Sequence, residues 1–419
     1  MLPVIPLAAP EATRFFDRTP TYNPGVEKTV AEIYDAVAAT GDEAVRGFCK
    51  QFDGEAPAEF FVAASEWDEG AAQVPQDLRD AIDRNLARIR AFHELQQTDI
   101  QLETMPGLTL GQTQVPYAKV ACYVPGGRAA YPSTVLMTVT LAAIAGVQDI
   151  IVATPPGPNG AVPPAVLYAA KAAGAHRILR VGGAHGVAAL AIGTQSIPRV
   201  QAIVGPGNQY VTAAKQRAGC HTDAPAGPSE LLILADDTAN PAYVALDLIA
   251  QAEHDPDAQV LLVTNSKALA VAVQTELETR APNAARADIV LAALQNGAIL
   301  LAENLDEALS ASNRYAPEHL TIMTRAPKDL LPRITAAGSV FLGHHTPVTL
   351  GDYGSGTNHV LPTMGQAALR GGLRVDDFCT TISWQEATPD ALQAIASDMT
   401  TLADAEGLYG HADAVRGRT

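Results

Sequence analysis

Amide, imidazole and carboxylate side chains with the spacing of metal ligands occur in the second half of the chain. Gln251 and His254 stand three residues apart at the end of a stretch with helical periodicity, so both lie on one helix face. Asp352 and His359 share a glycine-rich segment, and His411 lies in the tail. Such donors, without thiolate, suit zinc or a similar divalent ion. An isolated pair is more often a polar helix end, so the metal site is a hypothesis.

A carboxylate and an imidazole stand next to each other at Glu318 and His319. Adjacent side chains can reach one substrate only from a loop or a strand end, where they pair a base with a second acid or base. The same dipeptide also occurs by chance on solvated surfaces. Glu406 and His411 lie in a short amphipathic tail, where a lone histidine is more often a surface residue than a ligand. Acid–base chemistry is therefore a second hypothesis.

Three glycine-containing turns follow apolar runs that we predict as strands. They lie at residues 125–128, 182–185 and 205–208. Backbone N–H groups in such turns can approach a phosphate. The G-x-G-x-x-G fingerprint of dinucleotide sites is absent, and a single glycine after a strand is usually only a turn. Three turns at the carboxyl edge of one sheet would line the crevice where open α/β sheets bind ligands, which makes nucleotide binding a third hypothesis.

Apolar runs alternate with helical stretches through most of the chain. Helical segments begin near residues 132, 162, 187, 210 and 241. The runs predicted as strands are nearly unbroken, as in strands covered on both faces, and lie at residues 120–124, 150–154, 178–181, 202–204, 231–234, 260–263 and 339–342. This alternation predicts an α/β fold of mostly parallel strands joined by crossover helices.

We divide the chain into four parts. Periodic apolar residues at 27–51 and 76–97 predict helices in a charge-rich N-terminal region, residues 1–110, part of which could pack with the second α/β domain. Two Rossmann-like, doubly wound α/β domains follow at residues 111–236 and 237–375, and the second carries the metal and catalytic motifs. A C-terminal tail, residues 376–419, ends in a helical stretch from 389 to 415.

Composition and charge exclude several classes of protein. Hydrophobic residues make up 47% and charged residues 17% of the chain, which is typical of a globule and not of a disordered chain. The net charge of -17 is opposite to that of a nucleic-acid-binding protein. Four widely spaced cysteines predict neither disulfides nor a thiolate zinc site. With no membrane span or secretory signal evident, we expect a cytoplasmic protein acting on a small molecule.

The chain resembles the histidinol dehydrogenase family over nearly its whole length. The motifs that carry the resemblance occur in order as F-H-E at 92–94, Y-V-P-G-G-R at 123–128, Y-P-S-T-V-L-M at 131–137, V-G-P-G-N at 204–208, A-G-P-S-E at 226–230, Q-A-E-H-D at 251–255, A-P-E-H-L at 316–320 and G-T-N-H-V-L-P-T at 356–363. So many ordered motifs make the resemblance specific.

The resemblance implies an activity and a quaternary structure. It implies NAD-dependent oxidation of L-histidinol to L-histidine through L-histidinaldehyde, a four-electron reaction that uses two NAD and ends histidine biosynthesis. It also implies a homodimer with shared active sites and one zinc ion per subunit. The implied zinc ligands are Gln251, His254, Asp352 and His411, the last from the other subunit's tail.

The resemblance implies further roles for residues of the site. Glu318 and His319 are the implied catalytic residues, His319 taking the hydroxyl proton and Glu318 activating water. NAD contacts are implied at Tyr123, His185 and Asn208. The implied substrate contacts are Ser229, Gln251, His254, Glu318, His319, Asp352, His359, Glu406 and His411.

Other activities are compatible with the same residues. A paralogous zinc- and NAD-dependent dehydrogenase would oxidise another small polar alcohol, and residues 364–386 resemble relatives acting on sulfopropanediol. A zinc hydrolase would use Glu318 with a metal-bound water and no nucleotide. A binding protein without catalysis is the least specific alternative.

Overall fold

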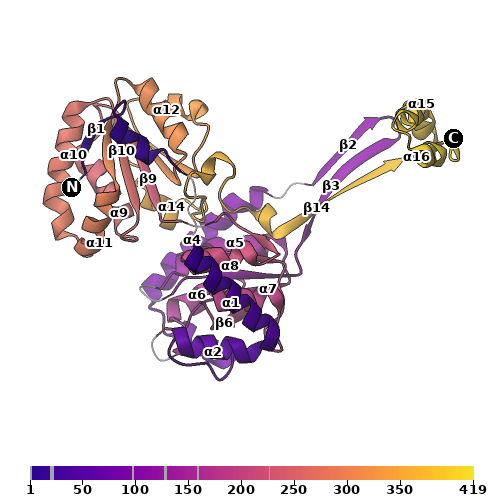
Figure 1. The fold of residues 1–419 in the computed structure, drawn as a ribbon, viewed down its shortest axis with the longest axis horizontal. Coiled ribbons are helices and arrows are strands. Elements are labelled where there is room, and N and C mark those ends of the chain that lie inside the picture. The colour runs from indigo at the N-terminus through magenta and orange to yellow at the C-terminus, as the bar shows by residue number, and fades with distance from the viewer. Residues whose placement is uncertain (1, 19–22, 97–98, 127–129, 158–159, 226) are drawn as a thin grey trace.

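The computed structural model describes residues 2–18, 23–96, 99–126, 130–157, 160–225 and 227–419. Gly127 and Arg128 of the first glycine turn, and Ala226 of the A-G-P-S-E motif, lie outside the described residues. Figure 1 shows two α/β domains and a long arm that ends in the C-terminal helices.

The first domain is built on a five-stranded parallel sheet with the order β6-β5-β4-β7-β8. Alternate residues of β4 enter the cores on opposite faces, so every residue of the strand after the exposed Lys119 is buried. The strands are β4 (Lys119–Tyr123), β5 (Asp149–Ala153), β6 (Arg177–Leu179), β7 (Ala202–Val204) and β8 (His221–Thr222).

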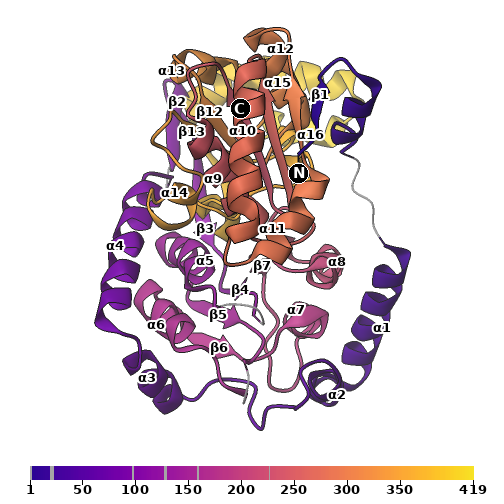
Figure 2. The same cartoon turned by 90° about the vertical axis from the view of Figure 1, so that its left-hand side faces the viewer.

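Helices cover both faces of this sheet, as Figure 2 shows. On one face lie α3 (Ala64–Ala72), α4 (Gln76–His93), α5 (Pro132–Ala145) and α6 (Pro164–Ala173). On the other lie α1 (Pro24–Thr40), α2 (Asp42–Phe52), α7 (Gly183–Ile192) and α8 (Gln209–Arg217). The predicted helix at 27–51 is thus two helices, separated at Gly41, whose φ of 58° falls in the left-handed region.

The second domain contains a six-stranded sheet, also parallel, with the order β1-β11-β10-β9-β12-β13. Its strands are β1 (Val4–Pro6), β9 (Glu230–Ala235), β10 (Gln259–Thr264), β11 (Ala298–Leu301), β12 (His319–Met323) and β13 (Ser339–Leu342). Its helices are α9 (Pro241–Ala252), α10 (Lys267–Arg280), α11 (Ala287–Ala293), α12 (Leu305–Tyr315), α13 (Pro327–Leu330) and α14 (Thr349–Tyr353).

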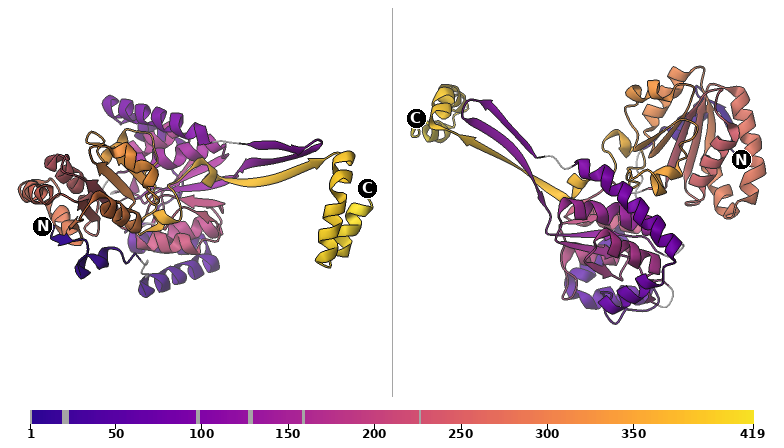
Figure 3. Two further views of the ribbon diagram at one scale, coloured as in Figure 1. Left: turned by 90° about the horizontal axis from the view of Figure 1, so that it is seen from above. Right: turned by 180° about the vertical axis from the view of Figure 1, so that it is seen from behind.

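The arm is a three-stranded antiparallel ribbon with the order β14-β3-β2. It consists of β2 (Ile100–Met105), β3 (Leu108–Pro116) and β14 (Cys379–Ala387), and it carries α15 (Pro389–Ala405) and α16 (Tyr409–Arg416). Figure 3 shows from two further sides that the arm projects away from both domains. The chain turns between α15 and α16 at Gly407, which has a φ of 74°.

The predicted α/β class with two mostly parallel sheets is confirmed, and several predicted placements are corrected. The strand at residues 231–234, placed in the first domain, pairs with β10 and β12 of the second sheet. Within residues 1–110, β2 and the start of β3 belong to the arm. β1 of the same region pairs with β11 of the second sheet, a packing that the prediction allowed. The tail begins with β14, an extended strand that pairs along β3. Among the described residues, no helix combines the length and apolar character of a membrane span.

Candidate active site

Glu318 and His319 lie at the amino end of β12, beside the amino end of β9. Both are nearly buried, with 7% and 6% exposure. The Glu318 Oε2 atom accepts a hydrogen bond from the backbone N–H of Glu230 at 2.7 Å and lies 3.4 Å from His319 Nδ1. His319 Nδ1 also lies 3.0 Å from the carbonyl oxygen of Glu230. The backbone of one β9 residue therefore contacts both predicted catalytic side chains.

These contacts fix the tautomer of His319. Both neighbours of Nδ1, the carbonyl of Glu230 and the carboxylate of Glu318, are hydrogen-bond acceptors, so Nδ1 carries a proton. In the neutral ring the lone pair is then at Nε2. Burial alone would lower the pKa of His319, but Glu318, Asp352 and the Glu230 carbonyl raise it to about 9. The site therefore holds the imidazole in its protonated form at neutral pH when no metal is present.

Glu230 is a second buried acid of the site, at 3% exposure. Arg18, from the N-terminal segment, forms an ion pair with its carboxylate and lies over the ring of Tyr315, 3.9 Å from the centroid. The backbone N–H of Met364 donates to Glu230 Oε1 at 2.8 Å. Burial raises the pKa of Glu230, and the Arg18 charge opposes that rise. Sequence reasoning missed Arg18, which has no local signal and is 212 residues from Glu230.

The predicted metal ligands Gln251 and His254 lie at the end of α9, and Asp352 lies in α14. Gln251 is 2% exposed, and its Nε2 atom has no hydrogen-bond partner among the described residues. Asp352 Oδ1 lies 3.2 Å from His359 Nδ1. Burial would raise the pKa of Asp352, but the hydrogen bond from His359 and the charges of His359, His319 and His254 lower it.

Electrostatic interactions connect Asp352 with both His254 and His319. The amide oxygen of Gln251, the imidazole of His254 and the carboxylate of Asp352 are donor types that suit zinc. The segment after α14 reaches the first domain, where Asn358 Nδ2 donates to the carbonyl of Met137 at 2.8 Å. This contact sets His359 between the two domains.

Glu406 and His411 do not join this site within one chain. Glu406 follows α15 and His411 lies in α16, at the far end of the arm. Ser229 immediately precedes β9, where its carbonyl accepts a hydrogen bond from the N–H of Gln259 at 2.9 Å.

The glycine turns and the predicted cofactor residues follow strands of the first domain. Tyr123 ends β4, and its hydroxyl accepts a hydrogen bond from the N–H of Gly183 at 3.0 Å. Asn208 follows the neighbouring strand β7 and caps α8 by accepting from the N–H groups of Tyr210 and Val211. Both residues therefore lie at one carboxyl edge, as the crevice hypothesis requires.

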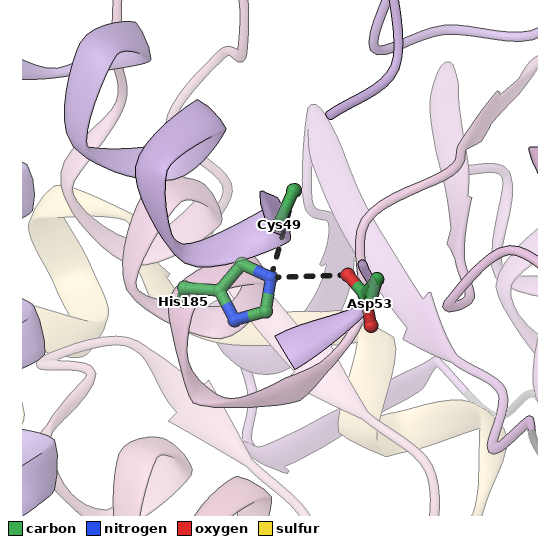
Figure 4. A group of neighbouring side chains, drawn as sticks. All are labelled: Cys49, Asp53 and His185. Carbon is green, nitrogen blue, oxygen red and sulfur yellow. Dashed lines mark hydrogen bonds and ion pairs between the residues drawn. The ribbon is translucent and has the colours of Figure 1, made fainter. Parts of the chain in front are cut away.

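His185 is oriented differently from Tyr123 and Asn208. Its imidazole is 2% exposed, and Nε2 lies 3.7 Å from both Cys49 Sγ and Asp53 Oδ2 of the α2 segment (Figure 4). Its predicted contact with NAD stays a prediction.

Comparisons with known proteins find similarity over nearly the full length of this chain. The histidinol dehydrogenase family profile matches residues 17–419. A histidinol dehydrogenase of Methanosarcina barkeri is 45% identical over 94% of this chain and 92% of its own length. One of Methanocaldococcus jannaschii is 46% identical over 93% and 92%.

A solved structure agrees as well. The crystal structure of histidinol dehydrogenase from Elizabethkingia anophelis superposes with a TM-score of 0.96 at 34% identity, covering 100% of this chain and 98% of that one. With this match, the resemblance drawn from the ordered motifs is confirmed: the chain belongs to the histidinol dehydrogenase family.

Proposed function

We propose that this chain oxidises L-histidinol to L-histidine through L-histidinaldehyde, with two molecules of NAD, as the last step of histidine biosynthesis. The observation that carries the proposal is the buried pair Glu318 and His319, held by the backbone of Glu230. A carboxylate and an imidazole side by side can act in turn on one carbon. The names of the relatives favour histidinol over another alcohol such as a sulfopropanediol.

His319 acts in the oxidation of the alcohol. The positive charge of a metal bound nearby would favour the neutral form of the ring. Because Nδ1 holds its proton between two acceptors, the neutral ring then takes the hydroxyl proton at Nε2. Glu318 acts in the oxidation of the aldehyde, where its carboxylate takes a proton from the water that adds to the carbonyl carbon. The contact between Oε2 and the N–H of Glu230 keeps that carboxylate oriented.

Gln251, His254 and Asp352 would hold zinc together with His411 of the partner subunit. When bound, zinc would fix the amine and imidazole of the substrate, and NAD would accept the hydride. These metal-ligating positions also border the bound substrate. The remaining substrate contacts that we propose are Ser229, His359 and Glu406 of the partner subunit.

The projecting arm and its exposed apolar side chains support a homodimer with shared active sites. The arm carries its own Glu406 and His411 away from both domains. It also exposes apolar side chains, including Ile100, Leu102 and Ile382, each more than half exposed. Surface of this kind is suited to burial against a second copy of the chain.

NAD is proposed to bind at the carboxyl edge of the five-stranded sheet, near Tyr123, His185 and Asn208. The hydrogen bond from Gly183 to Tyr123 holds the turn after β6 against the end of β4. The imidazole of His185 is buried and faces Cys49 and Asp53 of the α2 segment, so we expect it to hold this turn against α2.

The decisive experiment measures stoichiometry. Purified protein supplied with histidinol and NAD should form about two NADH per histidinol consumed, because each hydride transfer is one two-electron step. Sulfopropanediol and simple diols serve as competing substrates. Oxidation of one of these without oxidation of histidinol would overturn the proposed substrate, and about one NADH per histidinol consumed, with no histidine formed, would overturn the second oxidation.

A further inference from the structure

Three potential metal ligands converge on one point where α2 meets α7 in the first domain, apart from the Glu318 and His319 site of the second domain. Cys49 and Asp53 come from the α2 segment four residues apart, and His185 comes from the first turn of α7 (Figure 4). The sulfur, a carboxylate oxygen and a ring nitrogen all lie within 4.8 Å of one another. Among the described residues, no other group of three His, Cys, Asp or Glu meets this criterion.

Hydrogen bonding does not account for the arrangement. His185 Nε2 lies 3.7 Å from Asp53 Oδ2, which is longer than a hydrogen bond between nitrogen and oxygen. The same nitrogen lies 3.7 Å from Cys49 Sγ, a weak partner. One ring nitrogen thus faces two groups that it does not bind strongly.

The spacing suits a metal ion. Zinc bonds of about 2.0 Å to nitrogen and oxygen and about 2.3 Å to sulfur, in tetrahedral geometry, separate the ligand atoms by roughly 3.3 to 3.6 Å. Both distances to His185 Nε2 are only slightly longer than this. The ring packs beside the stacked pair Phe48 and Phe52, with centroids 6.1 and 5.8 Å away, which restricts its orientation.

The surroundings of the three side chains provide a metal ion with a way in and leave a fourth coordination position. Cys49 and His185 are buried, whereas the side chain of Asp53 is 19% exposed. An ion can enter past Asp53, and a water molecule can complete the coordination from the same side.

We propose that Cys49, Asp53 and His185 form a second metal site, which takes zinc or a chemically similar divalent ion with sulfur, oxygen and nitrogen ligands. The bound ion ties α2 to α7. The donor set differs from that proposed for the active site, which contains no sulfur, so the two sites can be told apart spectroscopically.

The test uses cobalt as the probe in the full-length protein, stripped of metal and kept reduced. Cobalt bound to a thiolate gives a near-ultraviolet charge-transfer band, which oxygen and nitrogen ligands do not give. We expect wild-type protein to develop this band to an amplitude of one thiolate-bound cobalt per chain, reached once both proposed sites are filled by two equivalents. Cys49→Ser should remove it, and Cys220→Ser, a change to a partly exposed cysteine of the same domain, should leave it intact.

A further variant keeps the proposal testable if Cys49→Ser does not fold. Asp53→Asn changes a solvent-accessible residue and should keep the band while weakening cobalt affinity at least about tenfold. The proposal is overturned if the wild-type protein shows no thiolate band when saturated with cobalt. It is also overturned if the band survives in Cys49→Ser or if Asp53→Asn binds as tightly as wild type.

Discussion

His319 is the residue on which the proposed first oxidation depends. Replacement by Asn should abolish alcohol oxidation because it removes the imidazole lone pair at Nε2 that is proposed to take the hydroxyl proton. Zinc content, measured by elemental analysis, should stay close to that of wild type because His319 is proposed as a base and not as a ligand. Wild-type turnover in this variant would contradict the assignment.

Glu318 should matter more for the second oxidation. Glu318→Gln keeps the size of the side chain but loses a base, so oxidation of supplied histidinaldehyde should fall more than the first hydride transfer. Single-turnover measurements on each substrate separate the two steps. Equal losses in both would argue against separate roles.

The raised pKa of His319 also predicts how stability depends on pH. Its folded-state pKa of about 9 exceeds the ordinary value of 6.5, so protonation favours the folded state. In metal-free protein this stabilisation should be full below pH 6.5 and should be lost as the pH rises toward 9. Thermal unfolding of wild type and His319→Asn should show a difference in Tm that shrinks over this range.

Residues of the site that are close together in the sequence could be predicted, whereas residues that are far apart in the sequence could not. Gln251 with His254, and Glu318 with His319, are close in sequence, so one helix face or one strand end presents both members. Arg18 and Glu230 are 212 positions apart in the sequence and meet only in the folded chain, and nothing near Arg18 marks it. The sequence gives Cys49 no role, because its neighbour His185 is 136 residues away in the chain and no local pattern connects the two.

At the level of elements, the N-terminal segment is fastened to β9 by the buried pair of Arg18 and Glu230. Arg18→Met should lower the free energy of unfolding by about 3 to 5 kcal/mol, because it leaves a buried carboxylate without its partner. When measured by urea unfolding, the double variant Arg18→Met, Glu230→Gln should recover part of the lost free energy of unfolding. No recovery would mean that packing of Arg18 on Tyr315, and not charge, accounts for the effect.

The parallel strands were predictable and the arm was not. Strands buried on both faces are continuous apolar runs, which a sequence displays directly. The arm strands are largely exposed and mix polar with apolar residues, and β14 pairs with β3 from far along the chain, Cys379 opposite Pro116. Pairing over such a separation leaves no periodic signal in either segment.

At the level of the whole molecule, a shared site predicts complementation between two inactive chains. Co-expressed His319→Asn and His411→Asn chains should form half mixed dimers, each with one intact site, and so regain about a quarter of wild-type activity. Each variant alone should be inactive. Mixtures that remain as inactive as the separate variants would show that each site uses the tail of its own chain.

The long arm has a consequence for when catalysis begins. The two parallel sheets of a newly made chain can form from that chain alone. The antiparallel arm, however, carries α15 and α16 away from the two domains and so from the Glu318 and His319 site of the same chain. A solitary chain would therefore be folded yet idle, and turnover would start only when two chains meet. Specific activity should then decline on dilution, and the midpoint of that decline would report how tightly the two copies hold each other.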